Sequence, residues 1–314
     1  WTAGETDAGA ATYFSRANGD YNTPSTWSKL NFNGPASTTA PNKQSDKVRI
    51  QGHTVTVSST TASANILSVE QNAVLRMQGN TVITGDTMRL MSNDRFEIGH
   101  KDGIVSLGST GAVQTLVRDL SPSAVYVYNG IGTQLTGNGL PSPVRSVIIE
   151  KAATDTLRLN QYIAITDSLV INSGILDIDA YSIDGNSAGR TLTMRSGEMI
   201  VRSAFPNNYT VPSFTAGTIN FNGSGNTTIP SSLSTPGVAQ YNNLRLGGQR
   251  NGVYILAPAG QIRIAGQFDM STLRFTGPLS QRFSVDGSTV VFNGAGNQNI
   301  PSRPLSPPDS IYTL

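Results

Sequence analysis

The sequence predicts an all-β protein, a parallel β-helix (β-solenoid) built from many short strands. The motif Phe-Asn-Gly-x-Gly-Asn-x-x-Ile-Pro occurs at 221–230 and again at 292–301, which indicates a repeat architecture. Short apolar segments with period-two alternation recur along the chain. Charged residues make up only 13%, against ~25% in typical proteins, and Gly, Asn, Ser and Thr are abundant instead. This composition favours strands joined by turns over helices.

The expected strands are three to five residues long, and glycine, asparagine or proline separates them. They cover Val48–Ile50, Thr54–Val57, Ile66–Val69, Val74–Met77, Thr81–Thr84, Val125–Tyr128, Val147–Ile149, Leu157–Leu159, Ile163–Ile165, Leu169–Ile171, Leu192–Met194, Ile219–Phe221, Ile262–Ile264 and Thr289–Phe292. Coils of roughly 20–25 residues would let such strands pair in parallel without helices. The alternative, tandem β-sandwich repeats, would prefer longer strands.

The repeated motif extends upstream to Thr218 and Thr289, and eight of the thirteen aligned positions are identical. A weaker copy begins at Tyr128–Gly132, so the Asn–Gly pair recurs at positions 129, 222 and 293. We expect Gly223 and Gly225 to permit a positive φ at a tight corner. The asparagines are expected to form side-chain ladders between stacked coils.

These repeats divide the chain into four expected segments. They are an N-terminal capping and β-helix segment (1–120), a first repeat unit with inserted coils (121–217), a second repeat unit (218–287) and the start of a third (288–314). Similar elements, 182–185 and 284–287, close the first two units. Residues 205–209 are expected to form a protruding loop, and the natural polypeptide to continue beyond Leu314.

Four aromatic residues, Tyr13, Phe14, Tyr21 and Trp27, cluster near the start of the chain. The terminal coil of a solenoid exposes its end layer and needs a cap. We therefore expect these rings to cap the β-helix, and a carbohydrate-stacking platform is the competing interpretation.

Composition also excludes several classes of site. The net charge is only +2, which offers no electrostatic basis for binding nucleic acid. The absence of cysteine excludes disulfides, thiolate metal sites and cysteine nucleophiles. No apolar run of transmembrane length occurs. His53 and His100 lack metal-ligand spacing and are expected in turns.

The best acidic cluster is Asp177, Asp179 and Asp184. Alternation places Asp177 and Asp179 on one strand face, where two carboxylates could bind calcium or form a glycosidase or lyase pair. An EF-hand loop needs a glycine where Ser182 stands, and no basic residue is adjacent in the sequence. A solvated strand face is the alternative interpretation. No catalytic residues and no cofactor are therefore predicted, with calcium at these three aspartates as the weak candidate.

Two N-terminal segments, 12–28 and 46–57, resemble the opening of large secreted Bacteroidota surface proteins. The Phe-Asn-Gly-x-Gly-Asn repeats and the following Tyr-Asn-Asn-Leu strand at 241–244 are similar to repeats of the same proteins. The resemblance implies an adhesin exported by the type IX secretion system, of the gliding-motility kind. The opening is also similar to the G8-type β-helix module. The C-terminal sorting domain of this class does not appear among these residues.

The same resemblance implies O-glycosylation at Asp-Ser/Thr followed by an apolar residue. Four positions match this pattern, and a modified hydroxyl would have to face solvent. They are Thr87, Thr156, Ser168 and Ser310. Chance occurrence at strand starts is the alternative.

Two functions follow as expectations. The first is a non-catalytic extracellular cell-surface adhesin or filament segment, a scaffold that attaches to surfaces or glycans. Its expected partners are a surface polysaccharide or other extracellular ligand and secretion or outer-membrane anchoring proteins. The second is a polysaccharide-active β-helix enzyme, a lyase or hydrolase. Convergence of Asp177 or Asp179 with Arg or Lys side chains in a groove would favour the second.

Overall fold

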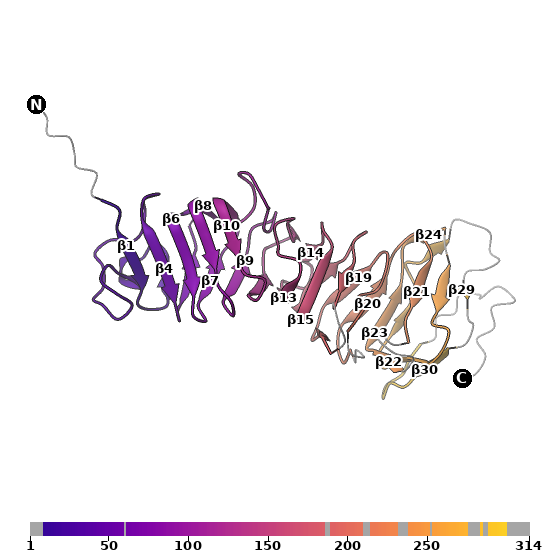
Figure 1. Cartoon of the computed structure of the whole chain (residues 1–314). Coiled ribbons are helices and arrows are strands. Elements are labelled where there is room, and N and C mark those ends of the chain that lie inside the picture. The colour runs from indigo at the N-terminus through magenta and orange to yellow at the C-terminus, as the bar shows by residue number, and fades with distance from the viewer. Residues whose placement is uncertain are drawn as a thin grey trace, which may run out of the picture. The chain divides into compact units, whose positions relative to one another are not determined.

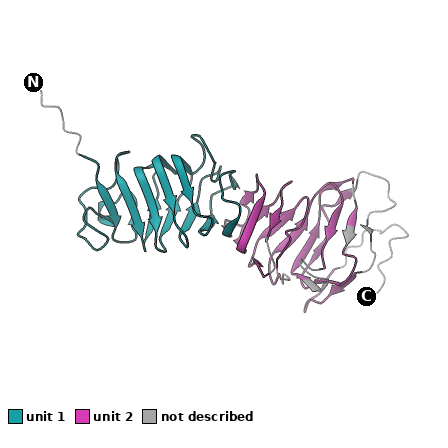
Figure 2. Ribbon diagram, viewed as in Figure 1, with its two compact units in different colours: residues 1–145 teal, residues 146–314 magenta. Residues whose placement is uncertain are grey.

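The chain folds as a parallel β-helix in each of two compact units, unit 1 (1–145) and unit 2 (146–314), shown in Figure 2. The computed structural model describes residues 9–59, 61–185, 189–209, 214–231, 238–251, 253–275, 283–284 and 288–299. Within these ranges the only helix is a single 3-10 turn, η1 (Pro24–Thr26). The predicted fold class is confirmed, and the β-sandwich alternative is wrong.

Most strands of unit 1 belong to two sheets that alternate along the chain. Its strands are β1 (Thr12–Ser15), β2 (Gly19–Asp20), β3 (Trp27–Ser28), β4 (Lys47–Gln51), β5 (Thr54–Val57), β6 (Thr61–Glu70), β7 (Val74–Met77), β8 (Val82–Leu90), β9 (Arg95–Ile98), β10 (Val113–Leu120), β11 (Val125–Tyr128) and β12 (Thr133–Leu135). One sheet has the order β10-β8-β6-β4-β1-β3, and the other runs β11-β9-β7-β5-β2 within this unit. Figure 1 shows β1, β4, β6, β8 and β10 side by side.

The core of unit 1 consists of apolar side chains stacked in register from coil to coil. Val48 pairs with Leu67, which pairs with Met88, and all three are fully buried. Alternation along β4 leaves its polar residues on the outside. Stacking therefore repeats one inward row through successive coils, and burial of that row stabilises the solenoid by ~25 cal/mol per Å² of apolar surface.

Aromatic rings close the N-terminal end of unit 1. Trp27 and Tyr21 are fully buried, their ring centroids lie 5.5 Å apart, and Trp27 Nε1 donates to the Tyr21 carbonyl at 2.8 Å. β3 runs antiparallel to β1 at the end of the sheet, whereas the solenoid strands pair in parallel. Tyr13 is also buried, so these three rings form an end cap and cannot be a solvent-facing platform. The fourth predicted ring, Phe14, is only half-buried and packs edge-on against Phe32, with centroids 5.1 Å apart.

Unit 2 arranges its strands in several parallel sheets. β13 (Val144–Glu150) contains the boundary between the units. The following strands are β14 (Thr156–Arg158), β15 (Ile163–Ser173), β16 (Ile175–Asp177), β17 (Ile183–Asp184), β18 (Thr191–Met194), β19 (Glu198–Val201), β20 (Thr218–Phe221), β21 (Thr227–Ile229), β22 (Val238–Tyr241), β23 (Asn243–Leu246), β24 (Gln249–Arg250), β25 (Tyr254–Leu256), β26 (Gln261–Ile264), β27 (Phe268–Asp269), β28 (Arg274–Phe275), β29 (Phe283–Ser284) and β30 (Thr289–Phe292).

The longest sheet within unit 2 has the order β14-β16-β19-β20-β23-β27, and we call it the ladder sheet. Its inward row joins Leu157, Leu176, Met199, Ile219 and Leu244, which are all buried. The other parallel sets are β21-β25-β29, β22-β26-β30 and β24-β28, and β15 pairs with β17 and β18. The outward side of the ladder sheet carries the polar residues considered below.

The repeated motif does not return to the same face of the solenoid. β20 belongs to the ladder sheet, whereas the equivalent strand β30 pairs with β26 in another sheet. The boundary between the compact units also falls inside the expected segment 121–217 and not at its limits. The spacing of the sequence repeat in this chain therefore differs from the length of a whole number of coils. The closing element 284–287 and the third unit after residue 299 lie mostly outside the described residues.

Candidate functional site

Asp177 and Asp179 lie at the end of β16 on the ladder sheet. The strand stops at Asp177, and Asp179 adopts a left-handed conformation with φ of 49°. The backbone N–H of Asp179 donates to Oδ1 of Asp177 at 3.0 Å. The two carboxylates therefore occupy a corner, and the uninterrupted strand face that alternation predicted is not formed.

Each of these aspartates is paired with an arginine from a neighbouring coil. Arg202, which follows β19, contacts Asp177 with Nε at 2.9 Å from Oδ1 and Nη2 at 2.8 Å from Oδ2. Arg158 on β14 contacts Oδ2 of Asp179 with Nε at 2.7 Å. Hydrogen bonding to Asp177 raises the pKa of Arg202. No basic residue is adjacent in the sequence, but coil stacking brings both arginines to the acids in space.

This convergence is the feature expected of the enzymatic alternative, but the groups are already bound to one another. The side chain of Asp177 is 7% exposed, and both of its oxygens accept from Arg202. A general base needs an available lone pair within reach of a substrate proton. Bidentate pairing with a guanidinium occupies those lone pairs. At this corner the Asp177 carboxylate is therefore engaged in an ion pair with Arg202.

The third calcium candidate, Asp184, forms a separate cluster. Its carboxylate accepts from the Asn208 amide at 2.6 Å and from the Tyr162 hydroxyl at 3.3 Å. Among the residues that the structure describes, no group of three His, Asp or Glu side chains could hold a metal ion. The proposed trio of Asp177, Asp179 and Asp184 therefore does not form one site.

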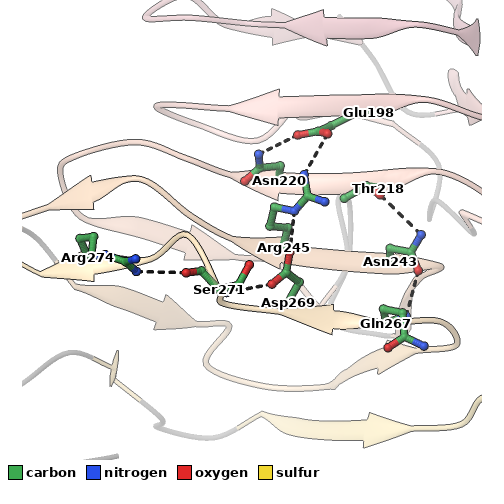
Figure 3. Close-up of polar contacts among 9 residues, drawn as sticks. All are labelled: Glu198, Thr218, Asn220, Asn243, Arg245, Gln267, Asp269, Ser271 and Arg274. Carbon is green, nitrogen blue, oxygen red and sulfur yellow. Dashed lines mark hydrogen bonds and ion pairs between the residues drawn. The ribbon is translucent and has the colours of Figure 1, made fainter. Parts of the chain in front are cut away.

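A second polar network crosses four strands of the ladder sheet (Figure 3). Arg245 on β23 lies between two acids, with Nη1 3.1 Å from Oε2 of Glu198 and Nε 2.9 Å from Oδ2 of Asp269. Asn220 on β20 donates to the other oxygen of Glu198 at 2.7 Å. Oδ1 of Asn220 has no partner among the described residues, although the residue is only 6% exposed. This network, the Arg245 ladder, ties β19, β20, β23 and β27 together.

The contacts of the Arg245 ladder favour the ionised form of Asp269. Burial raises the pKa of Asp269, but hydrogen bonds from Ser271 and pairing with Arg245 outweigh burial and hold the pKa below its ordinary value. Beside the ladder, Asn243 accepts from the Gln267 N–H at 2.9 Å, an amide-to-backbone contact between coils. Among the motif asparagines, which were predicted to form side-chain ladders, Asn226 accepts from the Val253 N–H at 3.0 Å, a bond to backbone and not to another asparagine.

Unit 1 uses the same kind of contact between coils. Arg49 pairs with Glu70 at 2.7 Å, and Glu97 receives Arg76 at 2.6 Å and Arg95 at 2.8 Å. Burial raises the pKa of Glu97, but the hydrogen bonds and charges of the two arginines outweigh burial and lower it overall. The partners Arg49–Glu70 and Arg76–Glu97 are each 21 residues apart, one coil length. Charged side chains in both units thus bind consecutive coils together.

The first glycine of the repeated motif is required by close backbone approach. A Cβ at Gly130, Gly223 or Gly294 would overlap a carbonyl oxygen of the preceding coil. Neither Gly223 nor Gly225 has a positive φ, so the expected left-handed corner is wrong at this copy. The equivalent of Gly225 in the weak copy, Gly132, does have a φ of 66°. The invariant feature of the motif is therefore the missing side chain at its first glycine.

A glutamine completes the corner in two of the three copies. Gln134 accepts from the Gly130 N–H at 3.0 Å and donates to the carbonyls of Ile98 and His100 at 2.7 and 3.0 Å. Gln298 repeats these bonds with Gly294, Ile264 and Gly266. Sequence comparison missed this residue because the better-matched copy has Thr227 at that position. Alignment of the weak copy with the last one would have shown the shared glutamine.

Arg250 takes the place of glutamine at the middle copy. Its side chain is fully buried, donates to the carbonyls of Gly223 and Gly225, and reaches Oγ1 of Thr227 at 3.0 Å. The guanidinium lies 3.8 Å from the ring centroid of Tyr254. Burial lowers the pKa of Arg250, while Tyr254 acts in the opposite direction. At the middle copy, the corner is thus held by the guanidinium of Arg250, where the other two copies use a glutamine.

The remaining predicted positions have different environments. Thr87 is 6% exposed and bonds Asp86, so in the folded chain it lacks the exposure that a glycan requires. Thr156 and Ser168 are half-buried. Ser310 lies outside the described residues. His53 and His100 bond Ser15 and the Asp102 N–H, as expected for turn histidines.

The segment 205–209 does not protrude as expected. Asn207 forms a parallel bridge with Asp184, and Tyr209 bridges Arg190. Phe205 packs on Phe214 and Phe221, with centroids 6.3 and 5.8 Å apart. The segment is therefore part of the solenoid wall, with the side chains of Asn207 and Asn208 exposed.

Comparison with known proteins adds no relative, since no family model, curated protein or solved structure matches the chain. None of the helical residues in the described part of the chain forms a segment long and apolar enough to span a membrane.

Proposed function

We propose that this chain is a non-catalytic segment of an extracellular cell-surface adhesin or filament. In this role the solenoid is a scaffold that holds binding positions in a fixed array and attaches to surfaces or glycans. Its partners would be a surface polysaccharide and the secretion or outer-membrane proteins that anchor it. The resemblance of residues 12–28 and 46–57 to secreted Bacteroidota surface proteins supports this role, including type IX export, gliding motility and glycosylation at Thr156 or Ser168.

The pairing of outward charges between coils is the observation that supports a scaffold most directly. Arg202, Arg158 and Arg245 all contact carboxylates of neighbouring coils. Ion pairs of this kind stabilise the stack and leave a surface without a large field of one sign. A protein that presents binding positions needs such rigidity more than it needs reactive groups.

The test is to incubate the chain with a panel of surface polysaccharides and to measure both adhesion and turnover. We expect retention on polysaccharide-coated surfaces with no new reducing ends and no unsaturated products. Product formation above that of heat-denatured protein would contradict the proposal. Labelling of intact cells with an antibody against the chain would test its location at the cell surface.

A polysaccharide lyase or hydrolase is the second candidate, favoured by the convergence of Asp177 with Arg202 and of Asp179 with Arg158. If this pair were catalytic, Asp177→Asn would abolish product formation. Arg263→Gln, on a strand of another sheet, is the matched control. Activity that is lost in the first variant and kept in the second would establish the enzyme and remove the scaffold proposal.

A further inference from the structure

The cluster around Asp184 is a polar surface whose parts come from three consecutive segments of unit 2. Tyr162 precedes β15, Asp184 ends β17, and Asn207–Tyr209 follows as the next rung. The bridge between Asp184 and Asn207 is reinforced by the Gly185 N–H, which donates to the Asn207 carbonyl at 2.9 Å. The surface amides are therefore held beside the carboxylate by backbone pairing. We call Tyr162, Asp184, Asn207, Asn208 and Tyr209 the Asp184 cluster.

The Asp184 carboxylate accepts a short and a long hydrogen bond within the cluster. Its Oδ1 accepts from the Asn208 amide at 2.6 Å. Its Oδ2 receives the Tyr162 hydroxyl at 3.3 Å, longer than the ~2.7–2.8 Å that O–H···O bonds prefer. A ligand hydroxyl could replace this long bond at little cost, because Tyr162 is 47% exposed and its hydroxyl can turn to solvent.

A second polar group in the cluster lacks a partner. Tyr209 is fully buried, and its hydroxyl makes no hydrogen bond among the described residues. Burial raises the pKa of Tyr209, and the charges of Asp184 and Tyr162 act in the same direction. A buried hydroxyl without a partner is costly, so a ligand oxygen that reached Tyr209 would supply a hydrogen bond that the described residues do not.

The chemistry of the cluster selects for an uncharged, hydroxyl-rich ligand. Apart from the Asp184 carboxylate, the polar side-chain groups of the cluster are neutral amides and phenol hydroxyls. The half-exposed ring of Tyr162 offers an apolar face, and the exposed Asn207 and Asn208 side chains offer amide groups. A sugar ring presents the same combination, an apolar face of C–H groups edged by hydroxyls that both donate and accept.

We propose that the Asp184 cluster is a subsite for a neutral sugar, with the ring of Tyr162 under the sugar and Asp184 accepting from its hydroxyls. This assignment rests on the proposed adhesin function and gives it a definite location. It uses the segment 205–209 as part of the wall, and no protruding loop is needed.

The test uses the full chain and neutral oligosaccharides of glucose, mannose, galactose and xylose, with binding measured by calorimetry. We expect at least one of these probes to bind, and Tyr162→Ala and Asp184→Asn to weaken it about tenfold or more. Tyr181→Ala is the matched control, because Tyr181 is a similarly exposed tyrosine (38%) that is not part of the cluster. Thermal unfolding of each variant verifies that the fold is retained.

Three results would overturn the subsite. They are binding that survives both variants, binding to none of the four probes, and binding of a lysine-rich peptide that Asp184→Asn abolishes. The first leaves the adhesin proposal intact, because the chain would still bind sugar elsewhere. Turnover of polysaccharide, in contrast, would remove the adhesin proposal whatever the variants do.

Discussion

Gln134 shows how much of the solenoid depends on single polar side chains. It is fully buried and makes three hydrogen bonds that join its own corner to the preceding coil. Gln298 makes the equivalent bonds, and Arg250 supplies a substitute where the chain has threonine. The chemistry of the corner is conserved inside one molecule even where the residue is not.

Removal of this side chain should therefore be costly. We expect Gln134→Ala to lower the free energy of unfolding by roughly 3 kcal/mol, because buried backbone groups lose their partners. Denaturant unfolding measures the effect. Gln114→Ala is the control, since Gln114 is half-buried and donates at 3.2 Å to Gly111. Equal effects of the two substitutions would contradict the assigned role.

The motif glycines give a second prediction at this scale. Gly223→Ala places a methyl group onto the Arg202 carbonyl, and we expect a loss of several kcal/mol because the backbone must move. Gly225→Ala, two residues away, meets nothing within 4 Å and should change stability by less than about 1 kcal/mol. Thermal melts of the two variants compare them directly. A mild effect at Gly223 would show that the coils can separate there.

At the scale of elements, strands were predictable and their partners were not. The expected segments Thr54–Val57, Val74–Met77 and Val125–Tyr128 are strands with those bounds, because alternation fixes which residues face the core. The expected pair Ile163–Ile165 and Leu169–Ile171 forms one strand, β15, since no glycine or proline interrupts it. The pairing of Asp177 with Arg202, 25 residues away, was missed because it depends on coil length.

The Arg245 ladder carries a prediction about acid stability. The pKa of Asp269 is lowered in the folded state, so its ionised form stabilises the fold above the ordinary carboxylate pKa near 4. That contribution is lost as the pH falls through the lower, folded pKa. Arg245→Gln should cost about 1 kcal/mol at pH 7, a modest value because the guanidinium is 34% exposed.

The cost of Arg245→Gln should shrink as the pH is lowered from 7 to 3, toward the lowered pKa of Asp269. Urea denaturation at both pH values measures it. Arg263→Gln is the control, because Arg263 donates to a neutral group, Gln261, at 3.0 Å. A cost that is the same at both pH values would mean that the ladder contributes packing alone.

At the scale of the whole molecule, the fold class could be predicted from the sequence, whereas the grouping of the candidate site residues could not. Amino-acid composition and sequence repetition predicted the β-helix because every coil of the solenoid shares them. The acidic trio was chosen by sequence proximity, yet stacking pairs Asp177 and Asp179 with arginines and leaves Asp184 beside Asn208. Proximity in a solenoid follows the coil period, so sequence neighbours are poor guides to a shared site.

Calcium provides a test at the same scale. The three candidate aspartates already have partners, and the described residues contain no cluster of three acidic or histidine ligands. We expect millimolar calcium to leave the melting temperature of the chain unchanged relative to the same concentration of magnesium. A calcium-specific rise would point to ligands outside the described residues, and Asp184→Asn would then decide whether this carboxylate takes part.

The Trp27 cap has a consequence for how copies of the protein behave together. The edge of a sheet is a template on which another chain can add strands. At the N-terminal end of unit 1, β3 pairs antiparallel with β1, and the buried Trp27 ring lies behind it. A second solenoid could not continue the parallel stack at β1 without displacing β3. The cap therefore prevents another chain from adding parallel strands to this end of unit 1.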